Sequence, residues 1–131
     1  PKYLKAYDRL TIGAAKADFF RYAILYKKGG VYLDVDSGMT KPLKYLIKPD
    51  DSAILSRERH PQFFVQWALI SEEGHPFLKK TLEMIVDNIE THRFPHDVHQ
   101  TTGPAAFTIA VNQCLEENPN IPHRIFEGID I

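Results

Sequence analysis

KKGGVYLDVDSG, residues 27–38, is the stretch from which the fold is read. Its two glycines follow a long helix-like run, as glycine often does just past the end of a helix. The β-type run at residues 31–36 then predicts a strand. Successive side chains of a strand alternate between its two faces, so Asp34 and Asp36 are expected to point the same way. Two neighbouring carboxylates repel each other unless a positive group lies between them, so the pair raises the question of what that group is.

Helices and strands are expected to alternate along the rest of the chain. Apolar periodicity and the Gly and Pro positions predict helices over residues 11–28, 76–91 and 104–117. They predict strands at residues 31–36, at 53–57, within 63–70 and at 123–127, and a loop at 92–100. Such alternation is typical of the α/β class.

Composition limits the classes of function. The 131 residues, 44% of them hydrophobic, suit a single domain, residues 1–131, with its own core. A net charge of −1 argues against a nucleic-acid partner. We find no apolar run of the roughly 18 residues that a membrane span needs. The single cysteine, Cys114, excludes an internal disulfide and is expected in the core beside Phe107 and Val111. The cellular compartment is left open.

The helix at residues 11–28 carries an unexpected pair of charges. Asp18 and Arg21 lie three residues apart, on one face of an otherwise apolar helix. Burying charges is costly unless they are paired or used, so both a simple ion pair and a functional pair remain open. Ligands of open α/β sheets gather at the carboxyl ends of strands, where Asp34 and Asp36 are expected.

Several sites could use the Asp pair. A helix-loop-helix calcium site is excluded, because it needs Gly and Glu where this sequence has Met39 and Tyr45. An aspartyl-phosphate phosphatase with Asp34 as nucleophile stays an alternative, although Gly38 stands where that family has Thr or Val. A solvated acidic turn is the plainest alternative.

A second group of possible metal ligands lies in the loop at residues 92–100. Pro95 interrupts any helix that would align these side chains, so we favour a solvated loop over a zinc site. The group comprises His92, His96, Asp97 and His99.

The combined spacing is more specific than the Asp pair alone. Asp18-x-x-Arg21 followed by GGVYLDVD (residues 29–36) resembles the signature of DXD glycosyltransferases of the family 32 type. That family includes initiating α-1,6-mannosyltransferases and capsular polysaccharide sugar transferases, and the glucosyltransferase domains of large clostridial toxins look similar. The resemblance continues in WALISEEGHPFLKKTLEMI (residues 67–85) and TTGPAAFTIAV (residues 101–111).

The resemblance implies a GT-A-like fold and a retaining glycosyltransferase that moves a sugar from a UDP- or GDP-sugar to a glycan or other acceptor. It also implies a divalent metal, Mn²⁺ or Mg²⁺. The segment that binds the nucleotide base in such enzymes is not recognised before the Asp18 helix, so the core is expected to be short or truncated at its N-terminus, or to be a central fragment. A truncated nucleotide- or sugar-binding module without turnover is a further alternative.

The resemblance also assigns roles to residues. Asp36 is expected to bind the metal, and Asp34 to contact ribose and sugar hydroxyls as well as the metal. Asp18 and Arg21 resemble the pair that holds the donor sugar and its phosphate. Together with Arg21, the two Asp side chains would carry catalysis. Two more residues are expected at the donor: Tyr32, and Gln66 where the family commonly has Asn.

Elementary chemistry agrees with these roles. A hard divalent cation on oxygen ligands bridges carboxylates and a leaving diphosphate, and arginine offers planar donors to phosphate oxygens.

Overall fold

The computed structural model describes residues 2–10, 13–33, 47–57, 63–66, 68–94 and 97–126. In chain order, the helices and strands of these residues are α1 (Lys2–Arg9), α2 (Gly13–Lys28), β1 (Gly30–Leu33), β2 (Ala53–Ser56), β3 (Ala68–Ser71), α3 (Pro76–Glu90), α4 (Val98–Thr101), α5 (Pro104–Glu117) and β4 (Arg124–Phe126).

The four strands form one mixed sheet in the order β1-β3-β2-β4. Strand β3 runs antiparallel to β1 and β2, whereas β2 and β4 are parallel. Strands β1, β2 and β4 therefore run in one direction, and their carboxyl ends lie at one edge of the sheet. In the register, Leu33 at the end of β1 lies opposite Ala68 at the start of β3. The segment before β3 therefore approaches the sheet at the edge where Leu33 lies.

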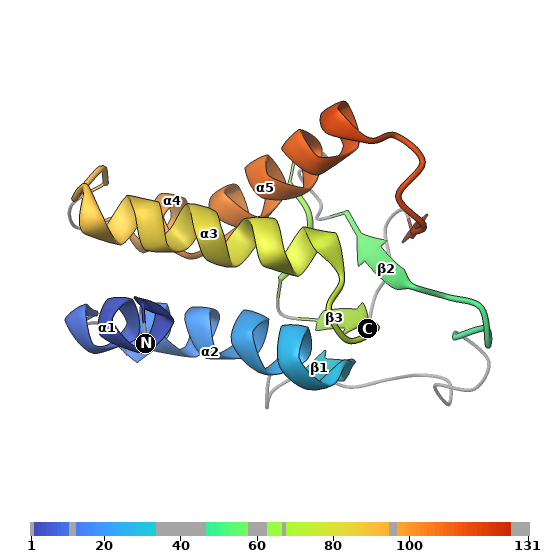
Figure 1. Cartoon of the computed structure of the whole chain (residues 1–131), viewed down its shortest axis with the longest axis horizontal. Coiled ribbons are helices and arrows are strands. Elements are labelled where there is room, and N and C mark those ends of the chain that lie inside the picture. Colours follow the sequence, from blue (N-terminus) through green and yellow to red (C-terminus); the bar gives the residue numbers. More distant parts are fainter. Residues whose placement is uncertain are drawn as a thin grey trace.

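The long helices pack together beside the sheet (Figure 1). Helix α3 contacts α1, α2 and α5, and α4 packs on α5. The core between them is built from buried aliphatic and aromatic side chains that include Phe19, Tyr22, Leu82, Ile85 and Phe107.

Local sequence explains where α3 begins. Its first residue, Pro76, fits the first helical turn, where a backbone N–H would have no partner inside the helix. The His75 ring caps the helix by accepting from the Phe77 backbone N–H. The large apolar side chains along one face of α3 are buried: Phe77, Leu78, Leu82, Ile85, Val86 and Ile89.

Most predicted elements are confirmed. Helices α2, α3 and α5 and strands β2 and β4 lie where the patterns placed them, within a residue or two where the structure describes their ends. The described part of the first strand is Gly30–Leu33, and residues 34–36 lie outside the described residues. Cys114 is buried in the core, as expected.

Three details differ from the prediction. The third strand starts only at Ala68, and before it Phe64 forms a single bridge with Arg57. The expected loop at 92–100 contains the short helix α4, because Asp97 caps it by accepting from the Gln100 N–H at 3.1 Å. Helix α1 was not anticipated.

Candidate functional site

Helix α2 buries the two charged side chains on which the sequence analysis focused. Asp18 and Arg21 are each 5% exposed. Arg21 Nη2 lies 3.5 Å from Asp18 Oδ1, so the two side chains form an ion pair one helical turn apart. The simple ion pair that was left open is therefore present, in surroundings where its charges are largely removed from water.

Contacts from two other segments hold the Arg21 guanidinium. Its Nη1 donates to Gln66 Oε1 at 2.6 Å and to the Gln66 backbone carbonyl at 2.9 Å. Its Cζ lies 4.5 Å from the centre of the Tyr32 ring, a cation–π geometry. The fold thus brings together four of the five residues expected to bind the donor, from α2, β1 and the segment before β3.

Two buried side chains join this cluster that the sequence analysis did not single out. Thr102, between α4 and α5, donates from its hydroxyl to Asp18 Oδ2 at 3.0 Å. Tyr22 donates from its hydroxyl to the Thr102 carbonyl at 2.9 Å. Burial first, and then the Asp18 charge, raise the pKa of Tyr22 well above its ordinary value, so the phenol keeps the proton that it donates. The signal in the sequence was a hydroxyl residue directly before Gly103-Pro104, at the start of a helix.

Helix α5 also supports the segment that carries Gln66. The Phe64 backbone N–H donates to the Thr108 hydroxyl at 2.9 Å, and the Val65 N–H donates to the Ser56 carbonyl at 2.7 Å. These bonds place the Gln66 backbone beside α2. Because Phe64 is hydrogen-bonded to α5 and Gln66 to Arg21, β3 begins only after this segment.

The two aspartates of the DXD stretch, Asp34 and Asp36, lie outside the described residues. The described part of strand β1 extends to Leu33, at the edge of the sheet from which the Gln66 segment comes. Two carboxylates form a hard oxygen donor set of the kind that Mn²⁺ and Mg²⁺ prefer. Within the described ranges, no group of three or more His, Cys, Asp or Glu side chains is arranged to hold a metal ion.

The histidine-rich segment at 92–100 has other contacts. His92 is hydrogen-bonded to Arg9 at 3.0 Å, Asp97 caps α4, and the His99 ring packs edge-on against Phe63. His96 lies outside the described residues.

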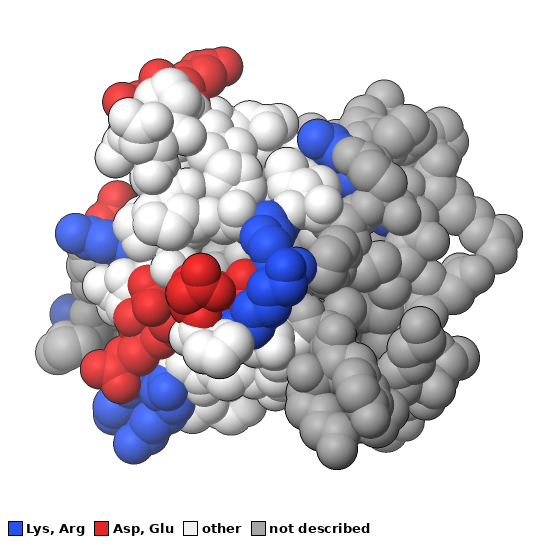
Figure 2. Space-filling view, turned by 90° about the vertical axis from the view of Figure 1, so that its right-hand side faces the viewer, with Lys and Arg blue, Asp and Glu red and all other residues white. Residues whose placement is uncertain are grey.

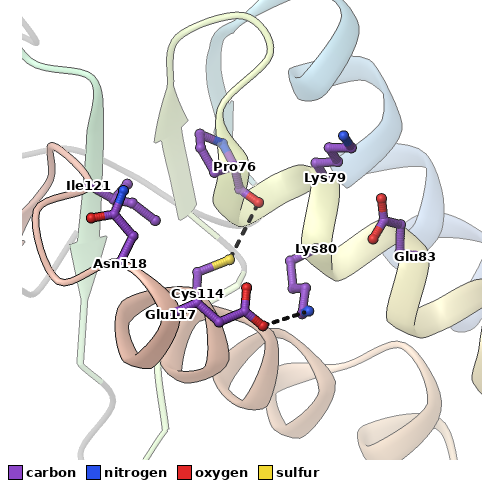
Figure 3. A pocket seen from close by; sticks show the side chains of 8 residues that line it. All are labelled: Pro76, Lys79, Lys80, Glu83, Cys114, Glu117, Asn118 and Ile121. Carbon is purple, nitrogen blue, oxygen red and sulfur yellow. Dashed lines mark hydrogen bonds and ion pairs between the residues drawn. The ribbon is translucent and has the colours of Figure 1, made fainter.

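A separate cavity of about 230 Å³ lies between the start of α3 and the end of α5 (Figure 3). Lys80 and Glu117 form an ion pair of 3.2 Å in its wall, and the Cys114 thiol lies 3.6 Å from the Pro76 carbonyl. Burial raises the pKa of this thiol, which disfavours the reactive thiolate. The cavity is lined by none of the residues expected at the donor site.

On the face of the molecule shown in Figure 2, the described acidic and basic side chains lie next to one another. This mixed surface agrees with the net charge of −1. None of the helices in the described residues has the length and apolar character that crossing a membrane requires.

Comparison with known proteins identifies relatives. The chain is 29% identical to the initiation-specific alpha-1,6-mannosyltransferase of Candida albicans over 85% of this chain and 37% of the relative. It is 31% identical to the enzyme of the same name from Schizosaccharomyces pombe, over 87% of this chain and 35% of the relative. The chain thus spans little more than a third of the length of either mannosyltransferase.

A solved structure shares the fold. The PaToxG glycosyltransferase superimposes with a TM-score of 0.63 and 27% sequence identity, over 81% of this chain and 36% of that one. Together with the mixed sheet and its helices, this likeness confirms the expected α/β, GT-A-like class.

A family model also matches the chain directly. It describes a glycosyltransferase sugar-binding region containing a DXD motif, and it covers residues 1–60. This range includes Asp18, Arg21, Tyr32 and the Asp-Val-Asp stretch, but neither Gln66 nor Thr102. Over residues 1–60, the chain is therefore similar to glycosyltransferase sugar-binding regions that contain the DXD motif.

Proposed function

We propose that residues 1–131 form one glycosyltransferase domain, or the central part of one, that transfers a sugar from a UDP- or GDP-sugar to a glycan with retention of anomeric configuration. The observation that carries the proposal is the buried Asp18–Arg21 pair, held by Gln66 and Tyr32 beside the strand that leads into the DXD stretch. Buried charges are costly, and here they lie at the sheet edge where α/β proteins bind ligands.

In this proposal, each side chain has a definite task. The Asp18 carboxylate accepts hydrogen bonds from hydroxyls of the donor sugar. Arg21 places its positive charge near the donor phosphates, and Gln66 and Tyr32 keep the guanidinium plane fixed. Because these contacts exist before the donor binds, little side-chain ordering remains to be done during catalysis.

Asp34 and Asp36 would hold the divalent cation, Mn²⁺ or Mg²⁺, with Asp34 also contacting ribose and sugar hydroxyls. When bound, the cation supplies positive charge that stabilises the leaving diphosphate. The support is the chemistry of the donor set and the family match over this stretch.

Nucleotide should therefore bind poorly without metal. Two like charges about 4 Å apart cost roughly 4 kcal/mol at an effective dielectric of about 20, and two carboxylates facing a diphosphate make several such pairs. Arg21 offsets only part of this repulsion. Isothermal titration of UDP and GDP into chelator-treated protein, and then into protein with Mn²⁺, measures the effect.

A pair of matched variants sharpens this test. Asp36→Asn removes one charge and one strong ligand, so it should abolish the Mn²⁺-stimulated binding. The control is Asp50→Asn, an exposed aspartate in a turn, which should leave the binding unchanged. Equal nucleotide affinity with and without Mn²⁺ would contradict the metal-dependent mechanism.

The same preparations separate the alternatives. A binding module would bind UDP or GDP with Mn²⁺ and yet release no sugar from UDP- or GDP-sugars. An aspartyl-phosphate phosphatase would trap beryllofluoride on Asp34 and ignore both nucleotides.

A further inference from the structure

We propose that Thr102 is a positioning residue of the donor site, whose buried hydroxyl fixes the Asp18 carboxylate in the orientation that binds the donor sugar. This inference rests on the proposed function, which it extends to a residue from a distant part of the chain. Thr102 lies 84 positions from Asp18 and outside the range that the family model matches.

The hydroxyl has one hydrogen and two acceptors within reach. Thr102 Oγ1 lies 3.0 Å from Asp18 Oδ2 and 3.4 Å from the Val98 carbonyl oxygen. The carboxylate oxygen is both closer and charged, and charge-assisted hydrogen bonds are the stronger ones. The hydrogen therefore points to Asp18.

This bond determines how the Asp18 carboxylate is oriented. Oδ2 accepts from Thr102, which precedes α5, while Oδ1 faces Arg21 Nη2 at 3.5 Å on the same helix as Asp18. Groups from two distant parts of the chain hold the two oxygens, so rotation of the carboxylate about its last side-chain bond would break one contact or the other.

Thr102 is itself held in place. Its carbonyl accepts from the Tyr22 hydroxyl at 2.9 Å, and its N–H donates to the Val98 carbonyl at 2.9 Å. Tyr22 lies four residues after Asp18 on α2, so both side chains project from one face of that helix. Both side chains contact Thr102: Asp18 accepts from its hydroxyl, and Tyr22 donates to its backbone carbonyl.

The position of Thr102 favours this role over helix capping. Threonine near a helix start often caps the helix with its hydroxyl. Here the N-cap of α5 is Gly103, which makes no side-chain cap bond, and the hydroxyl of the residue before it is directed at Asp18.

The test compares sugar nucleotides with bare nucleotides. Thr102→Val keeps the side-chain shape but removes the hydroxyl. With Mn²⁺ present, it should weaken binding of UDP-glucose or GDP-mannose, whichever the wild-type protein binds, by about tenfold, which corresponds to one hydrogen bond to a charged group. Binding of UDP or GDP should change less than about twofold. Thr102→Ser restores the hydroxyl and should recover most of the loss.

Thr81→Val is the matched control. Thr81 is fully buried and donates to the Phe77 carbonyl within α3, at 2.6 Å. This substitution should lower the urea midpoint without changing the ratio of sugar-nucleotide to nucleotide affinity. If Thr102→Val does not fold, Tyr22→Phe replaces it, because it removes the hydroxyl that holds the Thr102 carbonyl, and it should cause the same selective loss in a weaker form.

A measurement without ligand separates this inference from the proposed function. If Thr102 and Asp18 interact as described, Thr102→Val should lower the urea midpoint less in an Asp18→Asn background than in the wild-type protein. Equal losses in both backgrounds would overturn the inference, and so would equal loss of sugar-nucleotide and nucleotide binding. A third outcome is that the urea midpoints show Thr102 and Asp18 to be coupled, while the wild-type protein binds neither UDP-glucose nor GDP-mannose. That outcome would overturn the proposed function, and with it the donor-binding role of Thr102.

Discussion

A single guanidinium connects the parts of the candidate site. Arg21 is buried, and its planar group contacts Asp18, both acceptors of Gln66 and the face of Tyr32. These contacts come from different directions, and only a flat, rigid group with several donors satisfies them together. A compact ammonium on a flexible chain keeps the charge but not this geometry.

Arg21→Lys should therefore be costly although it conserves charge. We expect it to lower the free energy of unfolding by about 1–3 kcal/mol, because buried polar partners lose hydrogen bonds. It should also weaken Mn²⁺-dependent nucleotide binding. Urea denaturation and titration calorimetry measure the two effects.

Arg93→Lys serves as the control. Arg93 pairs with Asp87 at 2.9 Å, but both side chains are more than half exposed. Exposed pairs contribute about 0–1 kcal/mol, so this variant should be nearly neutral. Equal losses of stability in the two variants would show that the contacts of Arg21 carry no special weight.

At the scale of elements, the corner between α4 and α5, formed by Thr102 and Gly103, places Thr102 in contact with α2. The buried Asn88 of α3 donates to the Thr101 carbonyl at 3.2 Å, which ties the corner to the helix beside it. Gly103 then lets the two helices approach closely. A Cβ at this position would lie 2.9 Å from the Cα of His99, closer than atoms of a backbone tolerate.

Gly103→Ala should therefore shift the backbone of this corner, because there is no space for the added methyl group. Overpacking of this kind costs about 1–3 kcal/mol, and the shift should also remove the selective contribution of Thr102 to sugar-nucleotide binding. Gly13→Ala is the control, because nothing lies within 4 Å of a Cβ there, at the start of α2. That change should be neutral or slightly stabilising, since alanine favours helices. If the two variants have the same urea midpoint, the corner is not tightly packed.

The sequence predicts elements well where one physical signal dominates. Helices α3 and α5 combine apolar periodicity with a proline at the first turn, and both lie where expected. The third strand was placed too early because Phe63 and Phe64 have strand-like side chains, whereas the Phe64 N–H is bonded to α5 and the Val65 N–H to β2. Helix α4 has four residues and depends on the Asp97 cap, which apolar periodicity does not reveal.

For the whole molecule, local spacing predicts part of the site and the packing supplies the rest. Asp18 and Arg21 are one helical turn apart, so their pairing follows from helix geometry. Gln66 and Tyr32 were expected at the donor only through the family resemblance. Thr102 reaches Asp18 because α4 and α5, on either side of Thr102, both pack against α2. No local pattern in the sequence predicts that contact.

The helical layer and the sheet are joined by a buried histidine, His75. Its Nδ1 accepts from the Phe77 N–H at 3.2 Å, which requires the neutral ring. Its Nε2 then carries the hydrogen and donates at 3.0 Å to the carbonyl of Pro122, ahead of β4. Burial lowers the pKa of His75, while the Pro122 carbonyl and Glu72 raise it and His123 lowers it further.

This lowered pKa predicts a stability that depends on pH. The unfolded chain takes up a proton near the ordinary histidine value of about 6.5, whereas the folded chain does so only at lower pH. The contribution of His75 is therefore complete above pH ~6.5 and is lost as the pH falls toward the folded-state value. His75→Asn keeps a capping side chain but cannot titrate, so it should lower the urea midpoint at pH 7.5 and flatten its decline between pH 7 and 5. An unchanged slope in His75→Asn would mean that other groups set the acid sensitivity of the fold.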